Sequence, residues 1–418
     1  MRKKHIVKTI SLTLAFIGMG TFAQLNAQDV QLSHLRSTTR INLDLNKVWN
    51  YNIYEHSRWG VGLNVSMPFP ADSAKNYFEQ RKLYAEAYGG YGTRDHGWKY
   101  GAKAQVQRPR SYFDNVELGY RHDLERAGGH SFNTYDIFGT MNNSGYFSDR
   151  YSAIDRIHFG FGHSGRRNGF FVEGRLSQER HLFDNNALLY PLREDADKDN
   201  PAYAEAYRIA ELHVCDVWKK DLTVDITLGN ARLKGGSQPF VRLVGQYAHT
   251  YKLDGDAKTE VYLQGGYASS TAPLSRQFDL GGTAFGLYFF NHTFLTVRPN
   301  TFMANTFVHA CATYRSPALY KTRISYPCVI AQLNAMWGTQ TTGMRFLQQT
   351  VVDGVGISAP TQSVLEPALG LDKVIKWGIL DIGVAAAYQI TPASAPYHLT
   401  EPKDCLAIVG IATLVFEN

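Results

Sequence analysis

The chain has 418 residues, of which 44% are hydrophobic and 19% charged, and its mean hydropathy is −0.28. Its formal net charge is +6, but four of the positive charges lie within the first eight residues, so the rest of the chain is near +2. That balance gives no electrostatic support for nucleic-acid binding. After Phe22 no run of about 18 apolar residues occurs, which excludes membrane proteins built from spanning helices.

The N-terminus has the layout of a signal peptide. An apolar run from Ile10 to Phe22 ends near the small residues Ala23 and Ala27. The run is too short to serve well as an uncleaved membrane anchor. We therefore predict a signal peptide over residues 1–27 and a mature chain over 28–418, with cleavage after Ala23 as an open alternative. The basic residues before the run are Arg2, Lys3, Lys4 and Lys8.

Apolar residues recur at every second position along most of the mature chain. In 98–107, 115–121 and 222–229 they alternate with polar residues or glycine, so each segment has one apolar and one polar face. Many such runs reach about ten residues, the length that a tilted strand needs to cross a membrane, whereas β-sandwich strands are nearer five or six. The pattern predicts an all-β, single-domain protein, a transmembrane antiparallel β-barrel.

The alternation in 98–107 makes a residue-level prediction. Period two assigns Ala102 and Ala104 to the lipid and Lys103 and Gln105 to the lumen. An arginine on the lipid face is costly near the middle of the membrane, whereas a lumen position can hydrate it. The two faces can therefore be told apart by mutation.

Residues that tolerate a positive φ punctuate these runs and predict hairpins, not crossovers, between the strands. Dividing roughly 390 mature residues by about 25 per strand and connection predicts roughly 12 to 16 strands. The polar stretch from Arg193 to Pro201 is interpreted as an exposed loop. The turn signals are Thr93 to Gly97, Asn168-Gly169, Lys234 to Gly236, Asp254-Gly255 and Asp353-Gly354.

A possible nucleophilic site lies in the segment HFGFGHSGRRNG, where His163 stands beside Ser164 and near Asn168. A serine nucleophile needs a base within hydrogen-bond reach, but adjacent side chains on a strand point to opposite faces. The residues from Ser164 to Gly169 are also typical of a hairpin turn. We expect a turn here and no catalytic residue.

A possible calcium loop begins with acidic residues at alternate positions. Position six of the loop motif is Asn200 instead of glycine, and position twelve is Ala206 instead of a bidentate glutamate. We expect a solvated acidic loop and assign no metal site. The acidic residues are Asp195, Asp197 and Asp199.

The segment GYGTRDHGWKYG gathers charged residues around a tight turn, and it is the most suggestive segment for function. Charged residues at barrel turns and on lumen faces are ordinarily solvated or paired, and we expect that role here. They are Arg94, Asp95, His96 and Lys99.

Aromatic residues are abundant, and we interpret them as anchors at the membrane interfaces before a sugar-binding platform. The four cysteines have no metal-ligand spacing, and we expect them to be small buried or lipid-facing residues, although an exported chain could oxidise them. The aromatic residues are Trp59, Tyr88, Tyr91, Trp98, Tyr100, Phe159 and Phe161, and the cysteines are Cys215, Cys311, Cys328 and Cys405.

Six segments together resemble an uncharacterised outer-membrane barrel family, whose longer members carry an N-terminal carboxypeptidase-regulatory-like domain. The resemblance brackets most of the mature chain and implies a barrel fold. The segments are SRWGVGLNV (57–65), GYGTRDHGWKYGAK (90–103), GYRHDLERAGG (119–129), PLSRQFDLGG (273–282), TFLTVRPNTFMANTF (293–307) and LEPALGLDKVIKWGILDIGVAAAY (365–388).

The chain departs from that family in two places. The barrel-like pattern begins a few tens of residues after the predicted signal peptide, so we expect no regulatory-like domain before the barrel. Many barrels end on an aromatic residue, whereas Phe416 is followed here by two further residues. More remotely, FDLGG is similar to a glycine-rich strand of the surface-antigen barrels that insert or secrete other proteins, although the chain has no room for their POTRA repeats.

Architecture carries the functional expectation, because no catalytic, cofactor-binding or metal residue is assigned. We expect a protein of the cell outer membrane that is a channel or a helper of transport or assembly, and not an enzyme. The expected partners are outer-membrane lipids, lipopolysaccharide and the barrel assembly machinery, with an unknown solute or protein cargo and no nucleic acid or cofactor. The alternatives are a surface-exposed binding or adhesion protein, and a rim lipase-like enzyme.

Overall fold

The computed structural model divides into two compact units: unit 1 comprises Met1–Leu124 and Ile154–His163, and unit 2 comprises Glu125–Ala153 and Ser164–Asn418. No helix among the described residues is long and apolar enough to cross a membrane. The structure describes residues 39–44, 47–52, 55–69, 81–108, 114–126, 150–164, 169–183, 207–218, 221–233, 236–280, 287–288, 294–297, 302–339, 351–352, 355–356, 363–377, 380–390 and 405–414.

Unit 1 is built on an antiparallel ladder in which β3, β4, β5 and β6 pair in chain order. The short strands β1 and β2 pair one after the other along β3 and so act as one interrupted strand. The predicted turn at Thr93 to Gly97 joins β4 to β5. The strands are β1 (Arg40–Leu43), β2 (Trp49–Asn52), β3 (His56–Pro68), β4 (Lys82–Gly92), β5 (Trp98–Gln107), β6 (Asn115–Arg126) and β7 (Arg150–Ser164), of which Ile154–His163 belongs to this unit.

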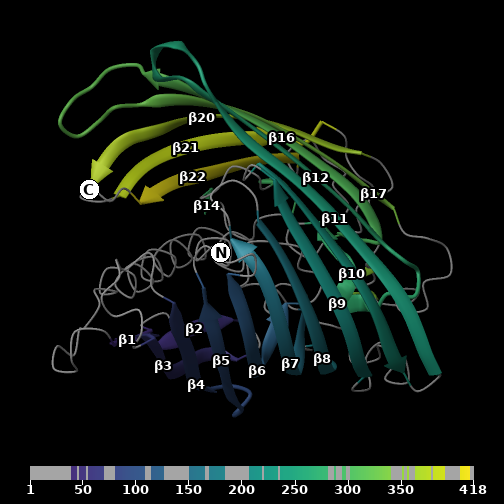
Figure 1. Cartoon of the computed structure of the whole chain (residues 1–418). Coiled ribbons are helices and arrows are strands. Elements are labelled where there is room, and N and C mark those ends of the chain that lie inside the picture. Colours follow the sequence, from purple (N-terminus) through teal and green to yellow (C-terminus); the bar gives the residue numbers. More distant parts are fainter. Residues whose placement is uncertain are drawn as a thin grey trace. The chain divides into compact units, whose positions relative to one another are not determined.

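Unit 2 is an antiparallel meander, and Figure 1 shows its long strands following one another in chain order. Its strands are β8 (Gly169–Phe183), β9 (Tyr207–Trp218), β10 (Leu222–Leu233), β11 (Gly236–Lys252), β12 (Lys258–Ala268), β16 (Thr306–Ala318), β17 (Cys328–Thr339), β20 (Val364–Trp377), β21 (Leu380–Tyr388) and β22 (Leu406–Leu414). Shorter elements are the 3-10 helices η4 (Asp254–Asp256) and η5 (Leu274–Arg276), and the strands β13 (Phe278–Leu280), β14 (Leu287–Tyr288), β15 (Phe302–Ala304), β18 (Val351–Val352) and β19 (Val355–Gly356).

The predicted all-β, antiparallel class is confirmed. Among the described residues, fifteen strands have nine or more residues, and β1 with β2 makes one more, which agrees with the predicted 12 to 16. Two further turn signals also lie at hairpins: Leu233 pairs with Gly236, and Gly255 has a φ of 69° between β11 and β12. Asn168, Asp353-Gly354 and the stretch from Arg193 to Pro201 lie outside the described residues.

The two faces of each unit's sheet have opposite chemistry. On β10, Asp225 and Thr227 are buried while Ile226 and Leu228 are exposed, and the other long strands repeat this alternation. We call the side with exposed large hydrophobic residues the apolar face and the other side the polar face. This arrangement, apolar outside and polar inside, is that of the wall of a membrane barrel and the reverse of a soluble sheet.

The two ends of the strands in unit 2 also differ. The long connections lie at one edge of the meander, which we call the loop edge, together with the two-residue connection 234–235. The long connections are 184–206, 269–305, 340–363 and 389–405. At the opposite edge, the turn edge, the connections are short. They are 219–221, 253–257, 319–327 and 378–379.

Candidate functional site

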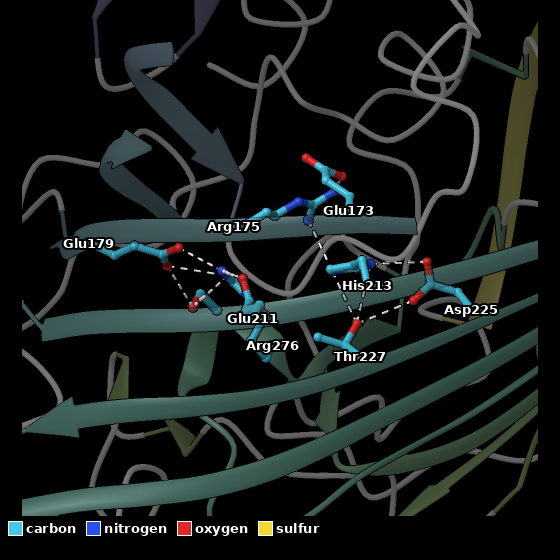
Figure 2. Close-up of polar contacts among 9 residues, drawn as sticks. Glu173, Arg175, Glu179, Glu211, His213, Asp225, Thr227 and Arg276 are labelled. Carbon is cyan, nitrogen blue, oxygen red and sulfur yellow. Dashed lines mark hydrogen bonds and ion pairs between the residues drawn. The ribbon is translucent and has the colours of Figure 1, made fainter. Parts of the chain in front are cut away.

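The most elaborate feature of unit 2 is the connection 269–305 between β12 and β16, which we call the insertion. Arg276 of the insertion reaches Glu179 on β8 and Glu211 on β9, whose side chains lie on the polar face (Figure 2). The guanidinium donates to Glu179 Oε1 at 2.6 Å and to Glu211 Oε1 and Oε2 at 2.6 and 2.8 Å. Ser275 donates to Glu179 at 3.0 Å, and all four residues are buried. We call this contact the arginine anchor.

The arginine anchor is a buried ion pair with many hydrogen bonds. Burial opposes the charge on Arg276, but the carboxylates of Glu179 and Glu211 outweigh that effect and raise its pKa well above the ordinary value. Two-pronged contacts between a guanidinium and a carboxylate fix geometry as well as charge. Removing one partner from such a buried group leaves an uncompensated charge and costs about 3–5 kcal/mol. The anchor therefore fixes where the insertion lies on β8 and β9.

A second anchor holds the insertion on β20. The carboxylate of Glu366 accepts backbone N–H groups from Leu295, at 2.9 and 3.0 Å, and from Thr296, at 2.7 Å, and it also accepts the Thr296 hydroxyl. Asn334 on β17 donates to the same carboxylate at 3.3 Å. Glu366 is fully buried, so these donors replace the water that a free carboxylate would require. We call this contact the glutamate anchor.

Apolar packing fills the space between the insertion and the polar face. The ring of Phe278 lies 4.7 Å from that of Phe307 on β16, and the guanidinium of Arg242 lies 4.9 Å above Phe278. Each fully buried aliphatic or phenyl side chain contributes roughly 1.5–3 kcal/mol. The insertion therefore covers this face of unit 2 by both ionic and hydrophobic contacts. The insertion contributes five residues to the buried hydrophobic cluster of unit 2: Ala272, Phe278, Phe294, Val297 and Ala304.

Beside the arginine anchor, a group on β9 and β10 has the composition of a nucleophilic triad (Figure 2). Thr227 Oγ1 lies 3.1 Å from His213 Nε2, and His213 Nδ1 lies 3.3 Å from Asp225. Arg175 also donates to His213 Nε2, at 3.0 Å, and arginine has only donors, so the lone pair of Nε2 is already engaged. Because Thr227 is fully buried and its base is occupied, this arrangement does not favour catalysis.

The charged turn singled out in the sequence forms a network in unit 1. Lys99 contacts Asp95 at 2.5 Å and Glu55 at 3.2 Å, and Arg58 bridges Glu55 at 2.6 Å to Asp123 at 2.8 Å. Glu55, Lys99 and Asp123 are buried. The prediction that these charges are paired is confirmed for Asp95 and Lys99. The backbone N–H of Arg94 donates to the Glu55 carbonyl at 3.0 Å, and its side chain lies 3.5 Å from His56 Nε2, while His96 Nδ1 lies 3.4 Å from the Tyr91 hydroxyl.

The structure describes only some of the residues weighed as candidate nucleophilic, calcium-binding and cysteine sites. His163 lies 3.2 Å from Asp114, and the side chain of Ser164 is outside the described residues, as are Asp195, Asp197 and Asp199. The four cysteines are free thiols, as expected. Among the described residues no group of three His, Cys, Asp or Glu side chains is placed to hold a metal ion.

Most of the aromatic residues interpreted as interface anchors do lie on the apolar face. Trp59, Tyr91 and Trp98 stand opposite one another across β3, β4 and β5, and both tryptophans are more than half exposed. Tyr100 and Phe159 are also exposed. One assignment was wrong: Tyr88 donates from its hydroxyl to the buried Asp123 at 2.6 Å, because it lies on the polar face of β4.

Sequence reasoning did not select the residues of the two anchors. Arg276 and Glu366 both fall in segments that carry the family resemblance, yet the charged or backbone groups that define each anchor lie far away along the chain. Glu366 had one local signal, a charge at an inward position of the alternating strand VLEPALG. Nothing in the sequence relates Arg276 to Glu179 and Glu211, which lie 97 and 65 positions away.

No family model and no curated protein matches the chain. Among solved structures it is similar to BamA from Haemophilus ducreyi lacking POTRA domains 1–3, at 10% identity and a TM-score of 0.49, over 90% of this chain and 70% of that one. It is also similar to CdiB from Acinetobacter baumannii, at 11% identity and a TM-score of 0.41, over 90% of this chain and 59% of that one. For CdiB from Escherichia coli the values are 10%, 0.42, 87% and 61%. The chain thus spans about three fifths of the two CdiB chains, and likeness at this level says nothing about its activity.

Proposed function

We propose that this protein resides in the outer membrane and acts there in transport or assembly, as a barrel whose lumen is narrowed by the insertion. The observation that carries the proposal is the pair of faces in unit 2: one is apolar and exposed, and the other is polar and partly covered by the described residues of the insertion. A large apolar surface is costly to expose to water, so on a protein it marks a site of association. A lipid bilayer that covers this surface removes the cost. The proposal includes no catalytic step and no cofactor.

The anchors support the idea of a restricted lumen. A segment that was only a surface loop would not need two separate contacts with buried charged groups. The insertion makes one through Arg276, which meets carboxylates of β8 and β9, and one through Leu295 and Thr296, which donate to the buried Glu366 of β20. Passage of a solute or a protein segment through the lumen would require the insertion to move. The contacts of Arg276 and Glu366 oppose this movement together with the apolar packing of the insertion, so weakening the two anchors should favour opening of the lumen.

Ion conductance across planar bilayers tests the proposal. The wild-type protein should conduct weakly, and the double variant R276M/E366Q should show larger or longer openings. Glu86→Gln, which removes a carboxylate of unit 1 that pairs with Lys103 at 3.7 Å, is the matched control and should behave as wild type. Recovery of the wild-type protein in the soluble periplasm, or equal conductance in all three proteins, would contradict the proposal.

A second candidate, a surface-exposed binding protein, is favoured by the long connections 184–206 and 340–363 at the loop edge of unit 2. Connections of this length often carry binding function. Shortening both connections should abolish binding to cells or polysaccharide and leave conductance unchanged if this candidate is right.

A further inference from the structure

An exposed patch with mixed apolar and cationic character lies at the turn edge of unit 2. It is formed by the connection between β16 and β17 and by the end of β20, and we call it the edge patch. Between 53% and 70% of each of its apolar side chains is exposed. Its apolar members are Leu319, Tyr320, Ile324, Ile375 and Trp377, and its exposed cations are Lys321 and Arg323.

The backbone of the edge patch is held in place by hydrogen bonds. Leu319 N–H donates to the Pro327 carbonyl at 2.8 Å, and Lys376 N–H donates to the Ile324 carbonyl at 2.8 Å. The second bond ties the turn to β20 beyond a bulge that shifts the register between Leu371 and Ile375. These apolar side chains are therefore presented by a fixed turn, and they need an apolar partner outside the chain.

The apolar members of the patch continue the apolar face of the sheet. Along β20 the exposed side chains are Leu369 and Leu371 before the bulge and Ile375 and Trp377 after it. Residues 372–374 of β20 stand opposite Gly383 alone on β21, so the bulge adds two residues. Because side chains alternate with a period of two, this even number keeps the large side chains on the same face. The lipid that covers the strands would therefore also reach the patch.

The charge of the edge patch is positive. The connection 319–327 contains Lys321 and Arg323 and no acidic residue. The nearby carboxylates are turned to other partners, since Asp372 accepts from Arg315 at 2.8 Å and Asp381 accepts the Tyr326 hydroxyl. Basic residues beside interfacial aromatic and aliphatic side chains match an anionic headgroup above acyl chains.

The lengths of the connections indicate which leaflet of the membrane the edge patch faces. Membrane barrels of the outer membrane have short periplasmic turns and longer extracellular loops. The edge patch lies at the edge with the short connections, opposite 184–206 and 340–363. We propose that the edge patch binds anionic phospholipid headgroups of the inner leaflet, with Lys321 and Arg323 at the phosphate. This inference rests on the proposed membrane location and adds a lipid partner and an orientation to it.

Native mass spectrometry of the full-length protein tests the lipid partner, with mixed detergent micelles of phosphatidylglycerol and phosphatidylcholine as the probe. Wild type should retain phosphatidylglycerol preferentially, and K321Q/R323Q should weaken that retention by about fivefold per charge removed, the effect of one cation at an anionic surface. The matched control is K252Q/K258Q, because these exposed lysines flank the turn between β11 and β12 at the same edge but stand beside Asp254 and Asp256. Equal retention in all three proteins, or equal loss in both variants, overturns the proposal.

Two further measurements show whether each variant is folded and which leaflet of the membrane the patch faces. Heat-modifiable gel migration of each variant shows that it is folded, and its loss in wild type would count against the membrane barrel instead of the patch. For the leaflet, Thr322→Cys in a chain with all four native cysteines replaced by alanine is treated with a membrane-impermeant maleimide. Reaction only after the outer membrane is permeabilised is expected. Reaction in intact cells would place the patch beside lipopolysaccharide and overturn the inner-leaflet assignment.

Discussion

At the residue scale, the polar face is organised by charges that are buried together with their partners. Arg276 meets two carboxylates, and Glu366 meets two backbone N–H groups and a hydroxyl. A buried charge with a complete set of partners is tolerated, whereas a charge that has lost its partner is strongly destabilising. Each anchor therefore acts as a strong local constraint on the insertion.

Arg276→Met should lower the free energy of unfolding by about 3–5 kcal/mol, because Glu179 and Glu211 then remain buried without their cation. Urea unfolding of the folded protein in detergent, followed by heat-modifiable migration, measures the change. The triple variant E179Q/E211Q/R276M should recover part of the loss, since no uncompensated charge remains. If R276M were as stable as wild type, the ion pair would have no structural weight.

Glu366→Gln should loosen the insertion at Leu295 and Thr296. The amide has one acceptor oxygen and presents N–H donors to groups that are themselves donors, and a buried donor without an acceptor costs about 1–3 kcal/mol. Hydrogen exchange of a peptide that covers 293–297 should become faster in E366Q and stay unchanged in the control E86Q. Unchanged protection in E366Q would contradict the role of the glutamate anchor.

At the element scale, β5 shows that alternation alone assigns the faces of a strand. Ala102 and Ala104 are exposed on the apolar face, while Gln105 is buried and Lys103 half-buried on the polar face, as the sequence predicts. Gln105 stands opposite Glu117 on β6. An arginine at position 105 would therefore have a carboxylate across the strand pair.

Ala104→Arg should reduce the folded yield more than Gln105→Arg. A lipid-facing arginine near the middle of the membrane costs on the order of 2–4 kcal/mol, whereas the polar face offers Glu117 as a partner. The heat-modifiable fraction of each variant after refolding into lipid measures the difference. Equal yields, or the reverse order, would mean that the faces of β5 or its depth in the membrane are misassigned.

At the scale of the whole molecule, stability is expected to come from the ladders and the buried charges and not from covalent links. Cys215, Cys311, Cys328 and Cys405 are free thiols on four different strands or connections. Replacing all four with alanine should leave the outer-membrane fraction and heat-modifiable migration intact. A variant that fails to fold, together with wild type that fails to fold in reducing agent, would indicate a disulfide.

The sequence by itself determined the class of fold and the two faces of its strands, because period-two alternation and turn residues act over a few positions. It also predicted the turn at Thr93 to Gly97. In addition, it identified Trp59 and Trp98 as outward-facing aromatic residues, and both lie on the apolar face. It did not identify Tyr88 as an inward residue, because a tyrosine suits an interface as well as a hydrogen bond to Asp123.

Only the tertiary structure brought the candidate site together. Arg276 meets Glu179 and Glu211 because the insertion folds back across β8 and β9, and Glu366 meets Leu295 because the same insertion reaches β20. Such contacts depend on which strands are neighbours and on the path of a long connection, and local periodicity contains neither. The edge patch has the same origin, since the bulge in β20 places Trp377 beside the turn that carries Lys321 and Arg323.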